Sequence, residues 1–139
     1  MGGGGGSGGR DSVGGAVWEE FFSESLSKIV GAKPEEVVVM GSLTNNLHLL
    51  MVSFFRPKGK RTKILCEAKA FPSDQYALAS QLRFHGLDPA THLIEVAPRD
   101  GEHHIHTADF KAAIDKHGDE IAMMMIGGVN YYTGQVMAR

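Results

Sequence analysis

The stretch KILCEAKAFPSDQYALASQLRFHG, residues 63–86, decides the fold. Its first five residues, Lys63–Glu67, form a short and largely apolar run that predicts a strand. Residues 70–74 predict a loop, which Pro72 stiffens. Apolar residues then recur at helical spacing as far as Gly86, a typical helix stop. A strand that leads through a short loop into a helix is the repeating unit of α/β proteins.

The same alternation continues on both sides of this unit. Residues 37–40 (VVVM) are a continuous apolar run, which is typical of a strand buried on both faces of a parallel sheet. The order α-β-α-β-α-β-α-β predicts right-handed βαβ units and a mostly parallel sheet with crossover helices. The expected strands are residues 37–40, 63–67, 92–96 and 121–126. The expected helices are residues 17–30, from near residue 44 to 55, 76–84 and, from residue 107 or 109, to 118.

Residues 1–15 differ in composition from the rest of the chain. They hold nine of the 18 glycines. This composition predicts a flexible leader, and the stretch has no apolar segment of the kind found in secretory signals. We therefore expect one α/β unit over residues 16–139. Because the chain ends just past the fourth expected strand, we expect this unit to be part of a larger domain.

Charge and cysteine content exclude several classes of protein. The net charge of −2 gives no electrostatic basis for binding nucleic acid. No run of about 20 apolar residues is present, so we expect no membrane span. Cys66, the single cysteine, leaves no internal disulfide and suits a reducing compartment. Within a strand, it is expected to be an inert buried thiol.

Two loops after expected strands carry candidate binding residues. The turn GSLTNN, residues 41–46, leads into a helix whose free N–H groups and Thr44 hydroxyl suit a phosphate. The alternative is that Ser42 or Thr44 only caps this helix. In the second loop, Phe71 can stack on a planar ligand or belong to the core, and Ser73 or Asp74 can cap the next helix. Neither a P-loop nor a GxGxxG fingerprint is present.

Two further segments leave their roles open. Tyr131 and Tyr132, in a glycine-rich loop, line a pocket or cover a sheet edge. The tract EHHIH, residues 102–106, places His104 and His106 on one face if it is extended, so chelation is possible. No cysteine or further carboxylate cluster lies near in sequence to complete a site, so we expect a solvated connection and no metal.

Three segments together resemble kynureninase. They are MGSLTNNLHLLMVSFF at 40–55, KILCEAKAFPSD at 63–74 and GVNYYTGQ at 128–135, and the likeness runs from about Leu26 to Gln135. It implies the large domain of a fold-type I enzyme that uses pyridoxal 5'-phosphate. It also implies hydrolysis of L-kynurenine or 3-hydroxykynurenine to anthranilate or 3-hydroxyanthranilate and L-alanine. The matching cofactor-binding residues are Leu43, Thr44, Phe71, Pro72, Ser73 and Asp74.

The resemblance carries further expectations and some departures. It implies a cytoplasmic homodimer in tryptophan catabolism and NAD biosynthesis. Gly127 stands where some members of the family have a cofactor-binding serine. The family's Schiff-base lysine lies beyond Arg139, and Lys69 does not match it, so this chain alone is expected to be inactive. The alternatives are another fold-type I enzyme, such as a cysteine desulfurase-like lyase, and a non-catalytic α/β binding module.

Overall fold

The computed structural model describes residues 16–137, with side chains from residue 22 onward. The predicted leader over residues 1–15 lies outside the described residues. The chain divides into two compact units, Met1–Gly41 and Ser42–Arg139. The division lies between Gly41 and Ser42. No helix within the described part of the chain is long and apolar enough to cross a membrane.

The described part of the first unit consists of one helix and a short turn. Helix α1 spans Ala16–Val30, as predicted, and the 3-10 turn η1 spans Pro34–Glu36. Gly31 ends α1 in the left-handed region, with φ +70°, a conformation that favours glycine. The N–H of Ala32 donates to the carbonyl of Ser27 over 3.0 Å and closes the helix end.

The predicted strand at residues 37–40 is not formed. The segment has no regular structure, and Val38, Val39 and Met40 are exposed. An apolar run becomes a strand only where a neighbouring strand takes up its N–H and C=O groups, and no strand is described within Met1–Gly41. The Ser23 hydroxyl instead donates to the Val37 carbonyl over 3.1 Å.

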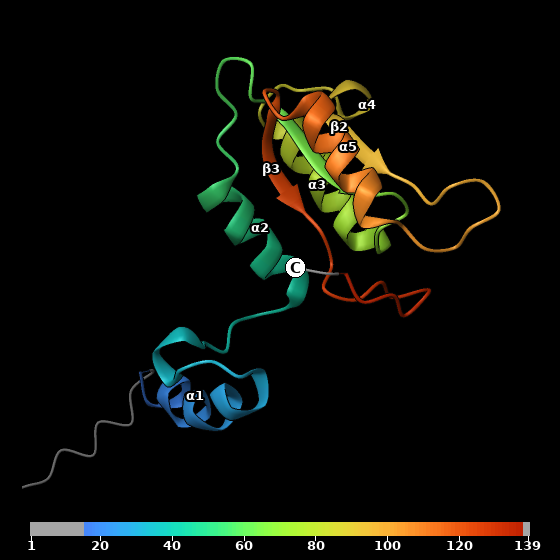
Figure 1. Cartoon of the computed structure of the whole chain (residues 1–139). Coiled ribbons are helices and arrows are strands. Elements are labelled where there is room, and N and C mark those ends of the chain that lie inside the picture. Colours follow the sequence, from blue (N-terminus) through green and yellow to red (C-terminus); the bar gives the residue numbers. More distant parts are fainter. Residues whose placement is uncertain (1–15, 138–139) are drawn as a thin grey trace, which may run out of the picture. The chain divides into compact units, whose positions relative to one another are not determined.

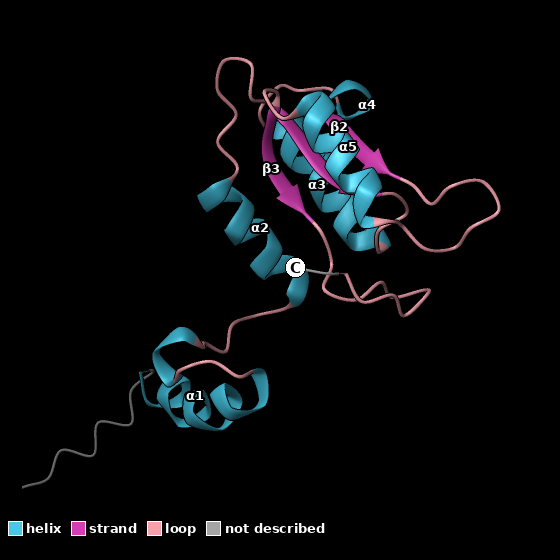
Figure 2. Ribbon diagram, viewed as in Figure 1, coloured by secondary structure: helices cyan, strands magenta, loops and turns pink. Residues whose placement is uncertain are grey.

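The second unit is the predicted parallel α/β arrangement (Figure 1). Its three strands stand in the order β2-β1-β3, and both pairings are parallel. Figure 2 shows the helices around this small sheet and the long loop that follows β2. The elements are α2 (Leu43–Phe54), β1 (Lys63–Glu67), α3 (Pro72–Phe84), α4 (Pro89–His92), β2 (Leu93–Val96), α5 (Thr107–His117) and β3 (Ile121–Met125).

Two strand boundaries differ from the prediction. His92 ends the one-turn helix α4 instead of opening β2, because Asp88 caps that turn and Pro89 begins it. The Asp88 carboxylate accepts the N–H of Ala90 over 3.0 Å. At the other end of the sheet, β3 stops at Met125, one residue before the predicted end.

The central strand β1 has a core on each face of the sheet. Successive side chains in a strand point to opposite faces, so Ile64 and Cys66 face α2 and α3 while Leu65 faces α5. All three are fully buried. The first core contains Met51, Phe55, Ile64, Cys66, Ala77, Leu78 and Leu82, and the second contains Leu65, Val96, Ile105, Phe110 and Ile121.

Candidate functional site

A cavity of about 570 Å³ lies where β1 and β3 end and α2 and α3 begin. This volume is within the range of small-molecule sites in proteins. Figure 1 shows the start of α2 and the segment after β3 at the same end of the unit. The cavity brings together five of the six predicted site residues; Pro72, the first residue of α3, is not in its lining. The lining residues are Ser42, Leu43, Thr44, Glu67, Phe71, Ser73, Asp74, Gly127, Val129 and Tyr131.

The amino end of α2 forms one wall of the cavity. Ser42 is its N-cap, and the Ser42 hydroxyl accepts the N–H of Asn45 over 3.3 Å. The N–H groups of Leu43 and Thr44, which precede Asn45 in the sequence, have no acceptor inside the helix. Because the helix dipole adds positive potential here, this wall suits an anionic group, and the Thr44 hydroxyl can supply another donor. Ser42 therefore caps α2 while the N–H groups of Leu43 and Thr44 stay available to a ligand.

The Phe71 ring forms a second wall, and half of the residue's surface is exposed. It is thus not the core residue that the alternative interpretation required. Tyr131 meets it edge to face, with ring centroids 5.1 Å apart and an interplanar angle of 86°. Such a pair favours one orientation of the two rings. Tyr131 lines the cavity, whereas Tyr132 is 83% exposed, so the two tyrosines have different surroundings.

Glu67 is a site residue that sequence reasoning missed. It is the last residue of β1, only 6% exposed, and it lines the cavity. The Asn130 side-chain amide donates to Glu67 Oε2 over 2.9 Å. Asn130 Oδ1 in turn accepts the N–H groups of Tyr132 and Thr133 over 3.0 and 2.9 Å. One asparagine therefore ties the loop that carries Tyr131 to the end of the central strand.

Asp74 lies in the first turn of α3 and faces the same cavity. Its predicted role as a helix cap is wrong, as is that of Ser73, because the N-cap is Phe71 and no side chain caps the helix. Burial of the carboxyl, and then the nearby charge of Glu67, raise the pKa of Asp74. Asp74 Oδ1 is buried without a hydrogen-bond partner. It is an acceptor that a ligand's N–H or O–H group can satisfy.

A neighbouring cavity of about 540 Å³ shares Leu43, Glu67, Asp74 and Gly127 with the first. Asn46, from the first turns of α2, also lines it, and Asn46 Oδ1 is a second buried acceptor without a partner. The two cavities thus combine an anion-binding helix end, an open aromatic face and two unsatisfied acceptors. No lysine lines either cavity in the part of the chain that the structure describes.

Gly127 leaves room for the Glu67 carboxylate. A Cβ built at residue 127 would lie 3.1 Å from Glu67 Oε1, closer than most real Cβ contacts. Since Glu67 is buried and held by Asn130, it has little freedom to move away. A serine at residue 127 would therefore require this carboxylate to shift by a few tenths of an ångström.

Cys66 lies beside the site and does not line it. Its predicted burial is confirmed, since only 1% of its surface is exposed. Burial, followed by the charges of Glu95 and Glu67, raises the pKa of the thiol to about 12. The thiol therefore stays protonated near neutral pH and is a poor nucleophile.

Comparison with known proteins identifies several relatives. No protein-family model matches the chain. The kynureninase of Flavobacterium johnsoniae is 62% identical over 119 residues, which is 86% of this chain and 28% of that protein. That of Christiangramia forsetii is 58% identical over 119 residues, with the same shares. That of Nematostella vectensis is 52% identical over 117 residues, 84% of this chain and 25% of that protein.

These relatives confirm the resemblance indicated by the three motifs. The chain spans about a quarter of the length of each of them. Since all three carry the same name, neither another fold-type I enzyme nor a non-catalytic module is favoured.

Proposed function

We propose that this chain, homologous over most of its length to one segment of the kynureninases, is part of a kynureninase. The observation that carries the proposal is 52–62% identity over 84–86% of the chain. The whole protein would hydrolyse the Cβ–Cγ bond of L-kynurenine or 3-hydroxykynurenine. Water supplies a hydroxyl to the carbonyl carbon and a proton to Cβ, giving anthranilate or 3-hydroxyanthranilate and L-alanine.

The residues around the cavity fit pyridoxal 5'-phosphate, the cofactor we propose for this site. The open amino end of α2 complements a phosphate, and the exposed Phe71 ring complements a planar pyridine. The orphaned Asp74 Oδ1 is a further sign that a polar group completes the site. When bound, this cofactor supplies an electron sink for carbon–carbon bond cleavage.

The chain's own residues would then bind and orient. Leu43 and Thr44 would hold the phosphate through N–H groups and, for Thr44, the hydroxyl. Phe71 would fix the plane of the cofactor, with Tyr131 holding Phe71 from the side. Pro72 pre-sets the backbone that begins α3, so that Ser73 and Asp74 face the cavity.

The decisive experiment places this chain in a complete enzyme. The matching 119 residues of the Flavobacterium johnsoniae kynureninase would be replaced by the residues of this chain, and anthranilate release from kynurenine would be followed by fluorescence. We expect a chimera that retains pyridoxal phosphate and forms anthranilate. The 139-residue chain alone should give no turnover with added cofactor, because no lysine lines the described cavities.

The result that contradicts the proposal is equally concrete. A chimera that folds like its parent and yet forms no anthranilate would show that this segment does not serve a kynureninase. Comparing the circular dichroism and the elution volume of chimera and parent separates that outcome from simple misfolding.

The setting of the whole protein is also part of the proposal. A homodimer in the cytoplasm, acting in tryptophan catabolism and NAD biosynthesis, follows from the assignment to the kynureninases. The exposed apolar side chains of α2 and the single buried cysteine are compatible with subunit contacts and with a reducing compartment. Sedimentation of the complete protein would test the dimer.

A further inference from the structure

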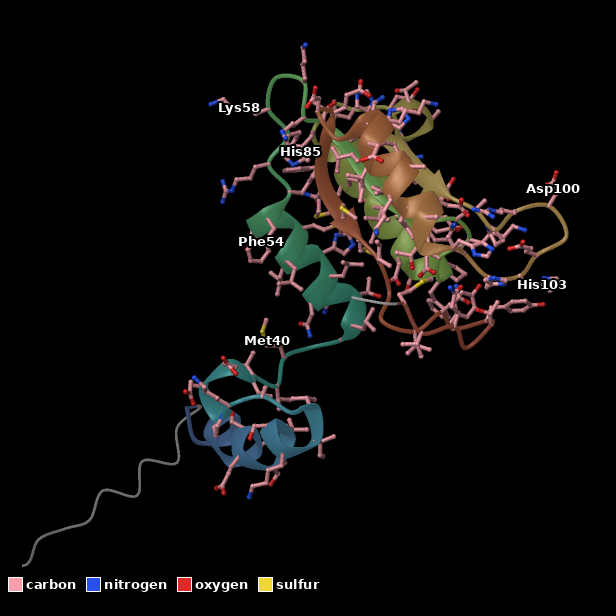
Figure 3. All side chains as sticks on the ribbon, in the orientation of Figure 1. Met40, Phe54, Lys58, His85, Asp100 and His103 are labelled. Atoms are coloured by element: carbon pink, nitrogen blue, oxygen red, sulfur yellow. The ribbon has the colours of Figure 1, made fainter. Side chains whose placement is uncertain are left out.

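A second cluster of chemically active side chains lies outside the cavity, in the loop between β2 and α5. Glu102, His104 and His106 each offer a ligand atom, and these atoms all lie within 4.8 Å of one another. His106 Nε2 is 2.5 Å and His104 Nε2 is 3.7 Å from Glu102 Oε2. The two imidazole rings have centroids 4.4 Å apart. Figure 3 shows Asp100 and His103 on this loop.

The backbone between the two histidines is fixed by a side-chain clamp. Ile105 is only 4% exposed and belongs to the core beneath α5. The Ile105 N–H donates to Gln135 Oε1 over 2.9 Å, and Gln135 Nε2 donates to the Ile105 carbonyl over 2.7 Å. With Ile105 held inward, its two neighbours His104 and His106 lie on the opposite side of the segment.

The backbones of the other two ligands are anchored as well. His106 is the N-cap of α5, and its carbonyl accepts the N–H of Asp109 over 2.9 Å. Glu102 follows a tight turn at Gly101, φ +80°, where the Glu102 N–H donates to the Arg99 carbonyl over 2.9 Å. Ligands on anchored backbone lose little freedom when an ion binds.

Neighbouring charges leave the Glu102 carboxylate available. Arg99, the cation closest in sequence, binds Asp109 through two nitrogens at 2.9 and 3.2 Å. The short contacts of the Glu102 carboxylate are therefore with two imidazoles, and Arg99 acts on it only through its charge. His104 is exposed and the other two residues are half-buried, so an ion can reach the cluster from solvent.

We propose that Glu102, His104 and His106 form a site for a divalent ion of the zinc type. Two imidazole nitrogens and one carboxylate are a donor set that Zn²⁺ accepts, whereas Mg²⁺ and Ca²⁺ prefer oxygen alone. Three protein ligands leave a fourth position for water. The site does not depend on the proposed function. The sequence favoured a solvated connection here, because no cysteine or further carboxylate cluster lies nearby in sequence. The three-ligand geometry depends on the contact between Ile105 and Gln135, 30 residues apart, which no local pattern contains.

The test is calorimetric titration of the untagged, chelator-treated chain with ZnCl₂. We expect one saturable site per chain. Removing a group that only hydrogen-bonds to a metal ligand commonly weakens metal binding about tenfold to hundredfold. Removing a ligand itself, as in His104→Gln, His106→Gln or Glu102→Gln, should therefore weaken Zn²⁺ binding at least about tenfold. His103→Gln is the matched control, since this exposed neighbour is not in the cluster, and it should leave the affinity within about twofold.

His104→Gln is the deciding variant, because His104 is exposed and lies outside α5. Its fold would be checked by circular dichroism, and Co²⁺ would be titrated in parallel, since loss of the visible absorption of imidazole-bound cobalt reports the same ligand. Absence of saturable Zn²⁺ binding would overturn the proposal. Equal affinities in the wild type and His104→Gln would overturn it too, as would a loss in His103→Gln as large as in His104→Gln.

Discussion

Thr44 stands at the open end of α2 and lines the cavity. Thr44→Ala in the chimeric enzyme removes one hydrogen bond to a charged group, about 1.5–3 kcal/mol. We therefore expect the dissociation constant of pyridoxal phosphate to rise about tenfold to hundredfold. Thr44→Ser, which keeps the hydroxyl, is the control and should restore most of the affinity. An unchanged constant in Thr44→Ala would remove Thr44 from the site.

Phe71 is exposed enough to contact a ligand and contributes no buried core surface of its own. Phe71→Leu should therefore lower the free energy of unfolding by no more than its edge-to-face contact with Tyr131 contributes, about 0.5–1.5 kcal/mol. It removes an aromatic pair worth about 0.5–1.5 kcal/mol, so cofactor affinity in the chimera should fall about twofold to tenfold. If the variant unfolds while each folded molecule binds as before, the ring is structural and the stacking proposal fails.

Burial of Cys66 makes the free energy of unfolding depend on pH. Because burial raises its pKa from an ordinary value near 9 to about 12, the folded state keeps a proton that the unfolded state releases above pH 9. The associated stability is thus complete below pH 9 and is lost as the pH rises toward 12. The free energy of unfolding should fall more steeply in this range for the wild type than for Cys66→Ala. A thiol reagent at pH 8 should react with Cys66 only after denaturation.

Single residues also show how far the sequence predicts this site. Phe71, Ser73 and Asp74 follow β1, a strand that was expected and is formed, so their place at its carboxyl end follows from the parallel arrangement. Leu43 and Thr44 lie at the start of α2, but the strand expected before them is not formed. Glu67 was missed because it is a charged residue at the end of an apolar strand. In a sequence, such a residue is expected to be solvated. Its partner Asn130 is 63 residues away, a pairing that no local pattern contains.

At the scale of elements, similar apolar runs had different outcomes. Lys63–Glu67 became the central strand because residues 93–96 and 121–125 pair with both of its edges. The run at residues 37–40 has an equally strong β pattern, but no strand within its own unit pairs with it. Strand formation depends on partners distant in sequence, whereas helices such as α3 close their hydrogen bonds locally. This is why helix positions were predicted better than the number of strands.

Asn130 holds the loop after β3, so Asn130→Ala tests how much this loop contributes to the stability of the fold. The variant leaves the buried Glu67 carboxylate without its amide donor and frees the N–H groups of Tyr132 and Thr133. We expect a loss of about 2–3 kcal/mol in the free energy of unfolding, measured in urea. Asn130→Ala combined with Glu67→Gln should lose less than the sum of the two single changes. Strict additivity would show that the two residues are not coupled.

At the scale of the molecule, the second unit exposes much apolar surface. Both edge strands, β2 and β3, have one unpaired side among the described residues. Leu43, Leu49, Leu50, Val52 and Phe54 of α2 are all exposed. Exposed apolar patches and free sheet edges promote association. We expect the 139-residue chain to self-associate with rising concentration, as measured by light scattering after size exclusion.

A paired substitution makes this prediction specific. Leu50→Glu with Phe54→Lys places opposite charges one turn apart on α2 and should shift the chain toward the monomer. Lys28→Gln, an exposed change on α1 that removes only an i,i+4 ion pair with Glu24, should leave the mass distribution as it was. Concentration-independent monomers of the unmodified chain would contradict the expectation.

The position of β1 in the middle of the sheet has a consequence for how the protein is made. Ile64 pairs with Leu93 on one side and with Met123 on the other. The strand β1 is synthesised first, so its two edges can be paired only after β2 and β3 have been synthesised. During translation it leaves the ribosome with both edges bare and with Ile64, Leu65 and Cys66 uncovered. Such non-local pairing slows folding and prolongs the lifetime of aggregation-prone intermediates. The nascent chain therefore exposes residues 63–67, with both strand edges unpaired, until residues 93–96 and 121–125 are available to pair with them.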